Sequence, residues 1–304
     1  MSAEVIIRPA TAEDLPEIMA IRTGEYPYMV RSLEGYRRIF ESVPARARKL
    51  HLVAVAGGVV AGVGTAELDI FTAEEGAGEA AVTVRPEYRG QGIGTALFAH
   101  AEQHLGEIGA RRVRTWVRDV PEYLAWARRF DFEPSRPVTF SRADPTNLPA
   151  MPALPAGVTL ISAAEAGPRM MYELDQATVA DEPGDIEIEM VPYDEWLTLL
   201  WGDADMRHDL GVVALVDGVP AASTVVQADL ATGRSWSGGT GVLRDFRGRG
   251  LAKLVKSDSL RRVAAAGITA AYTANDDQNA PMLAVNTWLG YRVTATQWSC
   301  MRTL

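Results

Sequence analysis

One glycine-rich stretch occurs twice in this chain, at a constant spacing of 158 residues. The first copy runs from Val84 to Gly94 (VRPEYRGQGIG) and the second from Val242 to Ala252 (VLRDFRGRGLA). Each copy follows an apolar run typical of a strand and opens a segment whose apolar residues recur at helical spacing. The repeat predicts two strand–turn–helix units, and 304 residues leave room for two domains.

The chemistry that suits such a turn is anion binding. The first N–H groups of a helix have no partner within the helix, and the helix dipole favours negative charge there. Glycines allow close approach of the backbone to an anion and adopt turn conformations that other residues resist. Arg89 and Arg247 add a cationic donor at each turn. We therefore expect each turn to bind a diphosphate.

Two well-known phosphate loops do not fit the repeat. The P-loop requires Gly-Lys-Ser/Thr after its glycine turn, and neither copy contains that sequence. The dinucleotide fingerprint requires a third glycine, and the first copy has Thr95 at that position. It also requires an acidic residue at the end of the next strand, and the strand predicted at 113–117 does not end with one.

The remaining pattern, Arg-x-x-Gly-x-Gly/Ala, resembles the acetyl-CoA diphosphate loop of the GNAT superfamily of acyltransferases. The resemblance implies an α/β (α+β) chain of two tandem GNAT-like domains, each with a mixed, mostly antiparallel sheet flanked by helices. It also implies acetyl-CoA as the acyl donor. The alternative is a pair of glycine-softened helix starts that bind no ligand. The pattern is carried by Arg89, Gly92 and Gly94 in the first copy and by Arg247, Gly250 and Ala252 in the second.

A proline-rich stretch separates the two predicted domains. Four prolines lie between Asp144 and Gly157, and proline at this density sustains neither a helix nor a strand ladder. We therefore predict an N-terminal domain at 1–143, a linker at 144–157 and a C-terminal domain at 158–304.

The composition restricts the classes of molecule that the protein is expected to bind. A net charge of −9 argues against nucleic acid, and no apolar run approaches the roughly 18 residues of a membrane helix. Cys300 is the single cysteine and the four histidines are scattered, so we expect no disulfide and no metal site. The first residues do not resemble a signal peptide, which favours a cytoplasmic protein. The oligomeric state is left open.

The resemblance also implies which residues contact the donor. The strand that ends at Val84 or Val242 would part from its neighbour, and its free amides would pair with the pantetheine and polarise the thioester carbonyl. Asn279 is predicted to cap the closing helix and to contact the pantetheine arm, and Asn286 to hydrogen-bond the cofactor or the substrate. The remaining predicted contacts are Gly90, Gln91, Gly92, Ile93, Gly94, Thr95, Thr240, Gly248, Arg249, Gly250, Leu251 and Ala252, with Arg89 and Arg247.

The proton chemistry departs from the family pattern. Many GNAT enzymes carry a tyrosine four residues before the glycine that ends the closing helix, where it protonates the leaving thiolate. This chain has Asn286 and Ala127 at those places, and neither can act as an acid. Tyr123, one turn from Ala127, is a weak substitute. Direct transfer still requires mainly positioning and a deprotonated amine.

A general base has to be a carboxylate or a water reached through one. Glu79 lies on the strand that enters the first turn, on the face opposite Val82 and Val84, and resembles the base of several family members. The alternative is a solvated strand residue. Ser237, 158 residues later, cannot serve as a base. Glu67, Asp69 and Asp229 are further candidates.

The function implied is transfer of an acetyl group from acetyl-CoA to the amine of a small molecule or peptide. We favour the second domain, because its glycine turn and its closing helix, Asn279 to Gly290, are both intact. One alternative is a non-catalytic acyl-CoA-binding sensor or scaffold. Another is mycothiol synthase, a tandem GNAT protein of about this size, although no motif here is specific to its acceptor.

Overall fold

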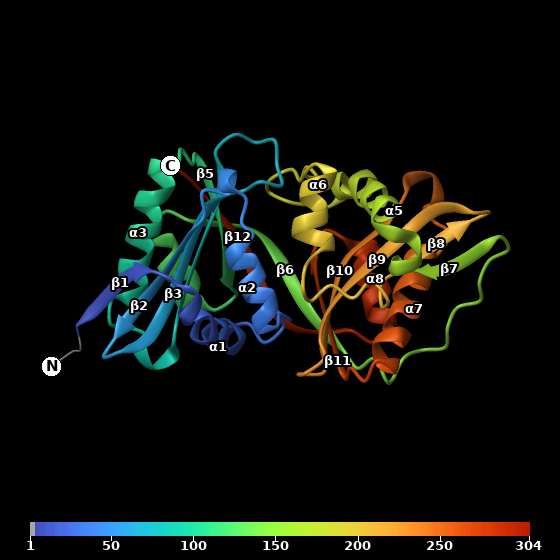
Figure 1. Ribbon diagram of the computed structural model, residues 1–304, viewed down its shortest axis with the longest axis horizontal. Helices are drawn as coiled ribbons and strands as arrows, with labels where there is room; N and C mark the ends of the chain where they lie inside the picture. Colours follow the sequence, from blue (N-terminus) through green and yellow to red (C-terminus); the bar gives the residue numbers. More distant parts are fainter. Residues whose placement is uncertain (1–3) are drawn as a thin grey trace. The chain divides into compact units, whose positions relative to one another are not determined.

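The computed structural model describes residues 4–304, which form two compact units (Figure 1). Unit 1 comprises the chain up to Pro27, Leu33–Arg136 and Gln297–Leu304. Unit 2 comprises Tyr28–Ser32 and Pro137–Thr296.

Unit 1 is a mixed sheet in the strand order β1-β2-β3-β4-β5-β12, in which β4 and β5 are parallel and the other neighbours antiparallel. Its helix α3 contacts β2, β3 and β4. The elements are β1 (Val5–Pro9), α1 (Leu15–Glu25), α2 (Leu33–Glu41), β2 (Leu50–Ala56), β3 (Val59–Leu68), β4 (Ala77–Val84), α3 (Ile93–Glu107), β5 (Arg112–Arg118), α4 (Pro121–Arg128) and the end of β12 (Arg292–Thr303).

Unit 2 repeats this plan in the order β6-β11-β10-β9-β8-β7, with β10 and β11 as its parallel pair. Helix α6 continues as one turn of π-helix, Leu197–Trp201. The mixed, mostly antiparallel strand order in each unit confirms the predicted fold class. The elements are β6 (Glu133–Ala143), β7 (Val158–Ser162), α5 (Ala163–Thr178), α6 (Tyr193–Trp196), β8 (Val212–Val216), β9 (Val219–Asp229), β10 (Arg234–Val242), α7 (Leu251–Ala265), β11 (Ala270–Asp276) and α8 (Ala280–Trp288).

Apolar side chains at helical spacing seat α3 and α7 on their sheets. Ile93 and Leu97 of α3 are buried among Leu52, Ala54 and Ala61, which point from β2 and β3 toward the helix. In unit 2, Leu251, Leu254 and Val255 pack on β8 and β9 in the same way. Each glycine turn is therefore followed by a helix whose apolar face packs in a core.

Two strands cross the boundary between the units. The division falls within β6, after Arg136, and within β12, after Thr296. Residues Val138–Ala143 pair with β11 in unit 2, and Gln297–Thr303 pair with β5 in unit 1. The predicted domain limits follow the order of the repeats in the chain, whereas the compact units contain exchanged strands. As limits of folding domains, 1–143 and 158–304 remain a prediction.

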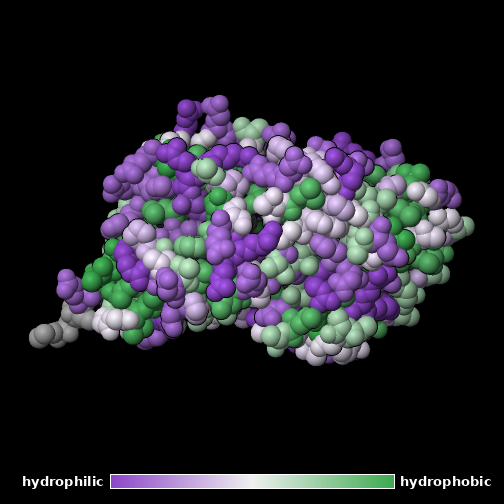
Figure 2. Space-filling model, in the orientation of Figure 1, coloured by the Kyte–Doolittle hydropathy of each residue, from purple (hydrophilic) through white to green (hydrophobic). Residues whose placement is uncertain are grey.

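On the face drawn in Figure 2, hydrophilic residues predominate and hydrophobic patches lie between them. Within residues 4–304, no helix has the length and apolar character needed to cross a membrane.

The exchange of strands predicts the behaviour of the single thiol. Cys300 is fully buried in the core of unit 1, together with Phe98 and Phe132, although it lies near the C-terminus. We expect Phe132→Ala, which removes about 3–5 kcal/mol from that core, to accelerate labelling of Cys300 by a thiol reagent in mild urea. Leu289→Ala, a truncation of similar cost in the core of unit 2, serves as the matched control. Faster labelling in Leu289→Ala alone would contradict the assignment of Gln297–Leu304 to unit 1.

Candidate functional site

The two glycine turns have the same backbone geometry. Gly90 and Gly92 have φ values of 73° and 83°, and Gly248 and Gly250 have 75° and 77°, all in the left-handed region. The first helical hydrogen bonds are from Ala96 N to Gly92 O and from Leu254 N to Gly250 O, so three N–H groups precede them in each helix. A Cβ added at any of the four glycines would meet no atom within 4 Å. The turns leave open space above a row of amides, which suits a diphosphate.

The arginine of each turn holds the loop in shape. Arg89 Nε donates to Val84 O at 3.0 Å, and Arg247 Nε donates to Val242 O at 3.1 Å. The outer nitrogens form ion pairs, Arg89 with Glu25 at 2.6 Å and Arg247 with Asp181. Hydrogen bonds from Arg244 and Arg247 lower the pKa of Asp181 to about 2. The predicted contact of these arginines with a diphosphate remains a prediction, and their contacts here are structural.

The remaining predicted turn residues occupy equivalent places in both units. Gln91 Nε2 donates to Glu87 O at 3.3 Å, and Arg249 Nη2 donates to Asp245 O at 3.2 Å. A Cβ on Gly94 would lie in ordinary contact with Trp126 and Val84 at 3.6 Å, which explains why the second copy accepts Ala252 there. Helix α3 begins with Ile93, Gly94 and Thr95, and helix α7 begins with Leu251, Ala252 and Lys253.

Both parallel strand pairs part before they reach the turns. The register of β4 with β5 covers Ala77–Glu79, and that of β10 with β11 covers Arg234–Trp236. Arg85 N donates to Ala61 O and Leu243 N to Ala221 O. Because main-chain groups alternate along a strand, the amides of Val84 and Val242 point away from β3 and β9, toward the parted side. An extended ligand can add there as a strand.

Strand β10 has a bulge where β4 has none. The register of β10 with β9 shifts between Ser237 and Thr240, at Gly238 and Gly239, whereas β4 pairs with β3 without a shift. Glu79 pairs with Glu67, and the equivalent pair in unit 2 is Trp236 with Gln227. The structural counterpart of Glu79 is therefore Trp236. The 158-residue spacing predicted Ser237 as the counterpart, and that prediction is wrong.

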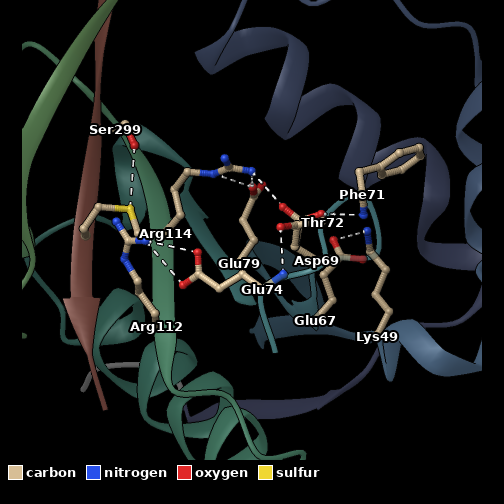
Figure 3. A network of polar contacts seen from close by, with 11 residues as sticks. Lys49, Glu67, Asp69, Phe71, Thr72, Glu74, Glu79, Arg112, Arg114 and Ser299 are labelled. Carbon is tan, nitrogen blue, oxygen red and sulfur yellow. Dashed lines mark hydrogen bonds and ion pairs between the residues drawn. The ribbon is translucent and has the colours of Figure 1, made fainter. Parts of the chain in front are cut away.

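Glu79 lies in a charged network at the start of β4 (Figure 3). Val82 and Val84 pack toward α3, so Glu79 is on the opposite face, as predicted. Arg114 donates to one oxygen of Glu79 from Nη2 at 2.8 Å and from Nε at 3.2 Å. The same Nη2 lies 3.4 Å from Asp69. The carboxylate of Glu79 is therefore engaged by the Arg114 guanidinium. Its role as base stays a prediction.

The other predicted bases differ from one another. Burial raises the pKa of Glu67, and the nearby Glu79 and Asp69 add to this effect, although Lys49 opposes it from 2.6 Å. Asp229 instead stabilises a turn, because its carboxylate accepts hydrogen bonds from Ala231 N and Thr232 Oγ1. Glu67 has the environment of a proton acceptor, and Asp229 has that of a turn residue.

In unit 2 two carboxylates that the sequence did not single out lie near the bulge. Glu182 Oε1 would be 3.9 Å from a Cβ placed on Gly239. Asp175 accepts a hydrogen bond from Trp196 Nε1 at 3.0 Å. Desolvation raises the pKa of both carboxyls, and Asp175 raises that of Glu182 further. The residue Glu182 is nevertheless open to solvent on one side. It lies in a polar loop without periodicity, so only the fold brings it to β10.

The closing helices differ as predicted. Asn279 caps α8, since its Oδ1 accepts from Met282 N at 3.3 Å. Asn286 is 4% exposed and its Nδ2 donates to Asn275 Oδ1 at 2.5 Å. Thr240 shares a hydrogen bond of 2.8 Å with Thr224. The contacts of these three side chains with a cofactor remain predictions.

Unit 1 places an alanine and a tyrosine in the corresponding helix. Ala127 is buried in the core. The guanidinium carbon of Arg89 lies 5.4 Å from the centre of the Tyr123 ring. Burial, and then the carboxylate of Glu25, raise the pKa of Tyr123. No group of three or more His, Cys, Asp or Glu side chains in the described part of the chain is placed to hold a metal ion.

Known proteins resemble this chain in fold and in part of its sequence. Residues 15–130 match the acetyltransferase (GNAT) family. A GCN5-related N-acetyltransferase from Sphaerobacter thermophilus superimposes with a TM-score of 0.76 at 19% identity, over 98% of this chain and 95% of that one. A tandem GNAT protein from the clavulanic acid biosynthesis pathway gives 0.77 at 20% identity, over 99% and 98%. At such identities the likeness concerns the fold.

Two curated relatives are mycothiol acetyltransferases. The protein from Cellulomonas flavigena is 33% identical over 109 residues, which are 35% of this chain and 31% of the relative. The protein from Rothia mucilaginosa is 41% identical over 71 residues, which are 21% and 20%. The chain thus spans less than a third of the length of the curated relatives that it matches.

Three findings point to the same kind of fold: the family match, the parted parallel strands, and the shared backbone geometry of the two glycine turns. Each unit has the same strand order and carries one complete turn ahead of a long helix. Residues 15–130 therefore carry the match to the acetyltransferase (GNAT) family, and the fold of the whole chain is similar to that of a tandem GNAT protein.

Proposed function

We propose that the protein transfers an acetyl group from acetyl-CoA to an amine, and that unit 2 is the catalytic half. The observation that carries this proposal is the bulge of β10, where glycine-rich backbone parts from β11 beside Glu182. Glycine within a strand permits close approach of a ligand to the backbone. Unit 1 has the single residue Ala81 in the corresponding part of β4.

The donor is expected to bind through main-chain groups. The N–H groups of Leu251, Ala252 and Lys253, with those of the turn, would hold the diphosphate. The pantetheine would lie along the free edge of β10 from Val242 to Thr240. Acetyl-CoA supplies the activated thioester, whose carbonyl oxygen an amide near the bulge would polarise.

Glu182 would then take the proton from the acceptor amine. The amine nitrogen bonds to the carbonyl carbon, the carbon–sulfur bond breaks, and the nitrogen loses a proton to Glu182, directly or through one water. Two carboxylates on this side, Glu182 and Asp175, favour an acceptor that arrives as a cation. The names of the two curated relatives add an acceptor of the mycothiol type to the candidates.

Unit 1 has the same turn, so we expect it to bind acyl-CoA as well. Glu79 is the base predicted there, and Arg114 competes for its carboxylate. Strand β4 lacks the glycine bulge of β10, and this difference is the reason for assigning catalysis to unit 2. The alternative of a non-catalytic sensor gains support from none of these features.

Donor binding is tested at the second glycine of each turn. Gly250→Asp places a negative charge where the diphosphate should lie, and Gly250→Asn places a side chain of the same shape without the charge. We expect Gly250→Asp to bind acetyl-CoA in unit 2 about tenfold or more weakly than Gly250→Asn, measured by calorimetry. Gly92→Asp and Gly92→Asn make the same comparison for unit 1.

Turnover assigns the catalytic half. We expect acetylation of an amine panel to be lost in Gly250→Asp and kept in Gly92→Asp. The reverse pattern would assign catalysis to unit 1 and to Glu79. Wild-type protein that binds acetyl-CoA and acetylates no amine would favour the sensor.

The pH profile tests Glu182. A base must be unprotonated, and the raised pKa means that activity is lost, as pH falls, at a higher pH than for an ordinary glutamate near 4.3. We expect Glu182→Gln to lower kcat/KM by about 10²- to 10⁴-fold and to remove this acidic limb. Glu187→Gln, at an exposed carboxylate on the same segment, should change neither. A profile that keeps its acidic limb in Glu182→Gln would exclude Glu182 as the base.

A further inference from the structure

The core of unit 2 contains a buried polar cluster below the point where β10 and β11 part. We define the Lys256 cluster as Lys256, Ser237, Asn286 and Tyr291, whose exposed fractions are 2%, 8%, 4% and 3%. Lys256 Nζ donates to Ser237 Oγ at 3.0 Å and lies 5.5 Å from the centre of the Tyr291 ring. These four polar residues lie on α7, β10, α8 and directly before β12, and all four are buried in unit 2.

The equivalent positions of unit 1 are apolar. Phe98 lies 158 residues before Lys256 on α3, and Ala80 has the strand register of Ser237. The other two positions flank the left-handed residue after the closing helix, which is Asp131 in unit 1 and Gly290 in unit 2. Four residues before it stand Ala127 and Asn286, and directly after it stand Phe132 and Tyr291. Phe98 and Phe132 pack edge to face at 5.7 Å.

A buried amine is costly, and unit 1 shows that this fold does not require one. An unpaired charge in an apolar core costs several kcal/mol unless the group becomes neutral. Desolvation lowers the pKa of Lys256 to about 7, and no carboxylate of the described residues contributes. The groups that face it are the Ser237 hydroxyl and the Tyr291 phenol, whose own pKa is raised by burial. Stability therefore gives no reason to keep this lysine.

Two atoms of the cluster lack partners. Among residues 4–304, Asn286 Oδ1 and Tyr291 Oη are buried and make no hydrogen bond. Buried polar atoms are nearly always paired, so two unpaired atoms among these residues leave bonding capacity for a bound group. The cluster offers donors and an acceptor to that group.

The position of Ser237 indicates what this group is. The last pair of β10 with β11 joins Trp236 and Tyr272, and Ser237 follows directly, before the glycine bulge. Its carbonyl accepts from Thr273 Oγ1 at 3.1 Å, which fixes it at the root of the parting strands. If the pantetheine lies between these strands, as the proposed function requires, its sulfur comes to this root.

We propose that Lys256, acting through the Ser237 hydroxyl, supplies the proton to the CoA thiolate that leaves during acyl transfer. When the carbon–sulfur bond breaks, its electron pair stays on sulfur. The Ser237 hydroxyl gives its proton to sulfur and receives one from the Lys256 ammonium, which becomes a neutral amine. Lys256 then regains a proton from solvent after the products leave. This inference rests on the proposed function of unit 2.

The acidities suit this transfer. A thiol has an ordinary pKa of about 8.5, so an ammonium with a pKa of about 7 gives up its proton to a thiolate favourably. A pKa near the operating pH also keeps part of the lysine charged before each turnover. The pair supplies the acid function that Asn286 and Ala127 cannot provide.

The pH profile of turnover tests the proposal. An acid has to be protonated, so in a Gly92→Asp background, which confines CoA to unit 2, we expect kcat/KM to fall as pH rises through about 7, the pKa of Lys256. Lys256→Met should lower kcat/KM and lose this basic limb. A basic limb that persists in Lys256→Met would overturn the assignment of Lys256. Failure of the background protein to bind CoA would instead overturn the proposed function.

A purely structural role predicts a different set of results. Met replaces a buried amine with an apolar chain, so Lys256→Met should unfold at the same or a higher temperature while it loses turnover and the basic limb of the pH profile. Ser237→Ala should lower turnover as well. Ser259→Ala serves as the control, since this hydroxyl lies on the same helix and donates to Leu210 O at 2.9 Å. It should lose stability and keep the basic limb. Lower stability of Lys256→Met with unchanged turnover would assign the lysine to the fold alone.

Discussion

The hydrogen bond from the turn arginine to the last carbonyl of the preceding strand is the contact on which each site depends. Arg89 with Val84, and Arg247 with Val242, close the loop between a strand that has left its neighbour and a helix that begins at a left-handed glycine. The loop amides and the free strand edge are thereby held in one arrangement. Such preorganisation lets main-chain groups bind an anion and polarise a carbonyl without reorganising at the moment of reaction.

The two units combine this shared backbone with different interiors. Unit 1 fills the space behind its parting strands with Phe98 and Phe132, and it keeps a regular β4. Unit 2 places Lys256 and Tyr291 there and bends β10 with glycines. Polar groups in a core reduce stability, and a bulge interrupts a strand ladder. The two units thus differ in backbone and in core at the place where the proposed function assigns the reaction to unit 2.

Much of the site could be predicted because it consists of backbone. A glycine that needs positive φ, a helix start and an apolar strand are local features, so the residues of both turns were identified from the sequence. The candidate bases were harder to predict from the sequence. Glu79 was placed on the correct face by strand alternation, but its ion pair with Arg114 depends on the neighbouring strand. Glu182 belongs to a loop whose path has no periodic signal.

The sequence by itself determined the repeat, the strand and helix beside each copy and the two glycine turns, because these follow from local conformational preference and hydrophobic spacing. Only the tertiary structure decided which strands each unit contains, since β6 and β12 are divided between the units. It alone revealed the bulge, which shifts the register by one residue and makes Trp236 the counterpart of Glu79. It also brought Lys256 to Ser237. Pairing register and burial arise from contacts between segments far apart in the chain, and such contacts leave no local pattern.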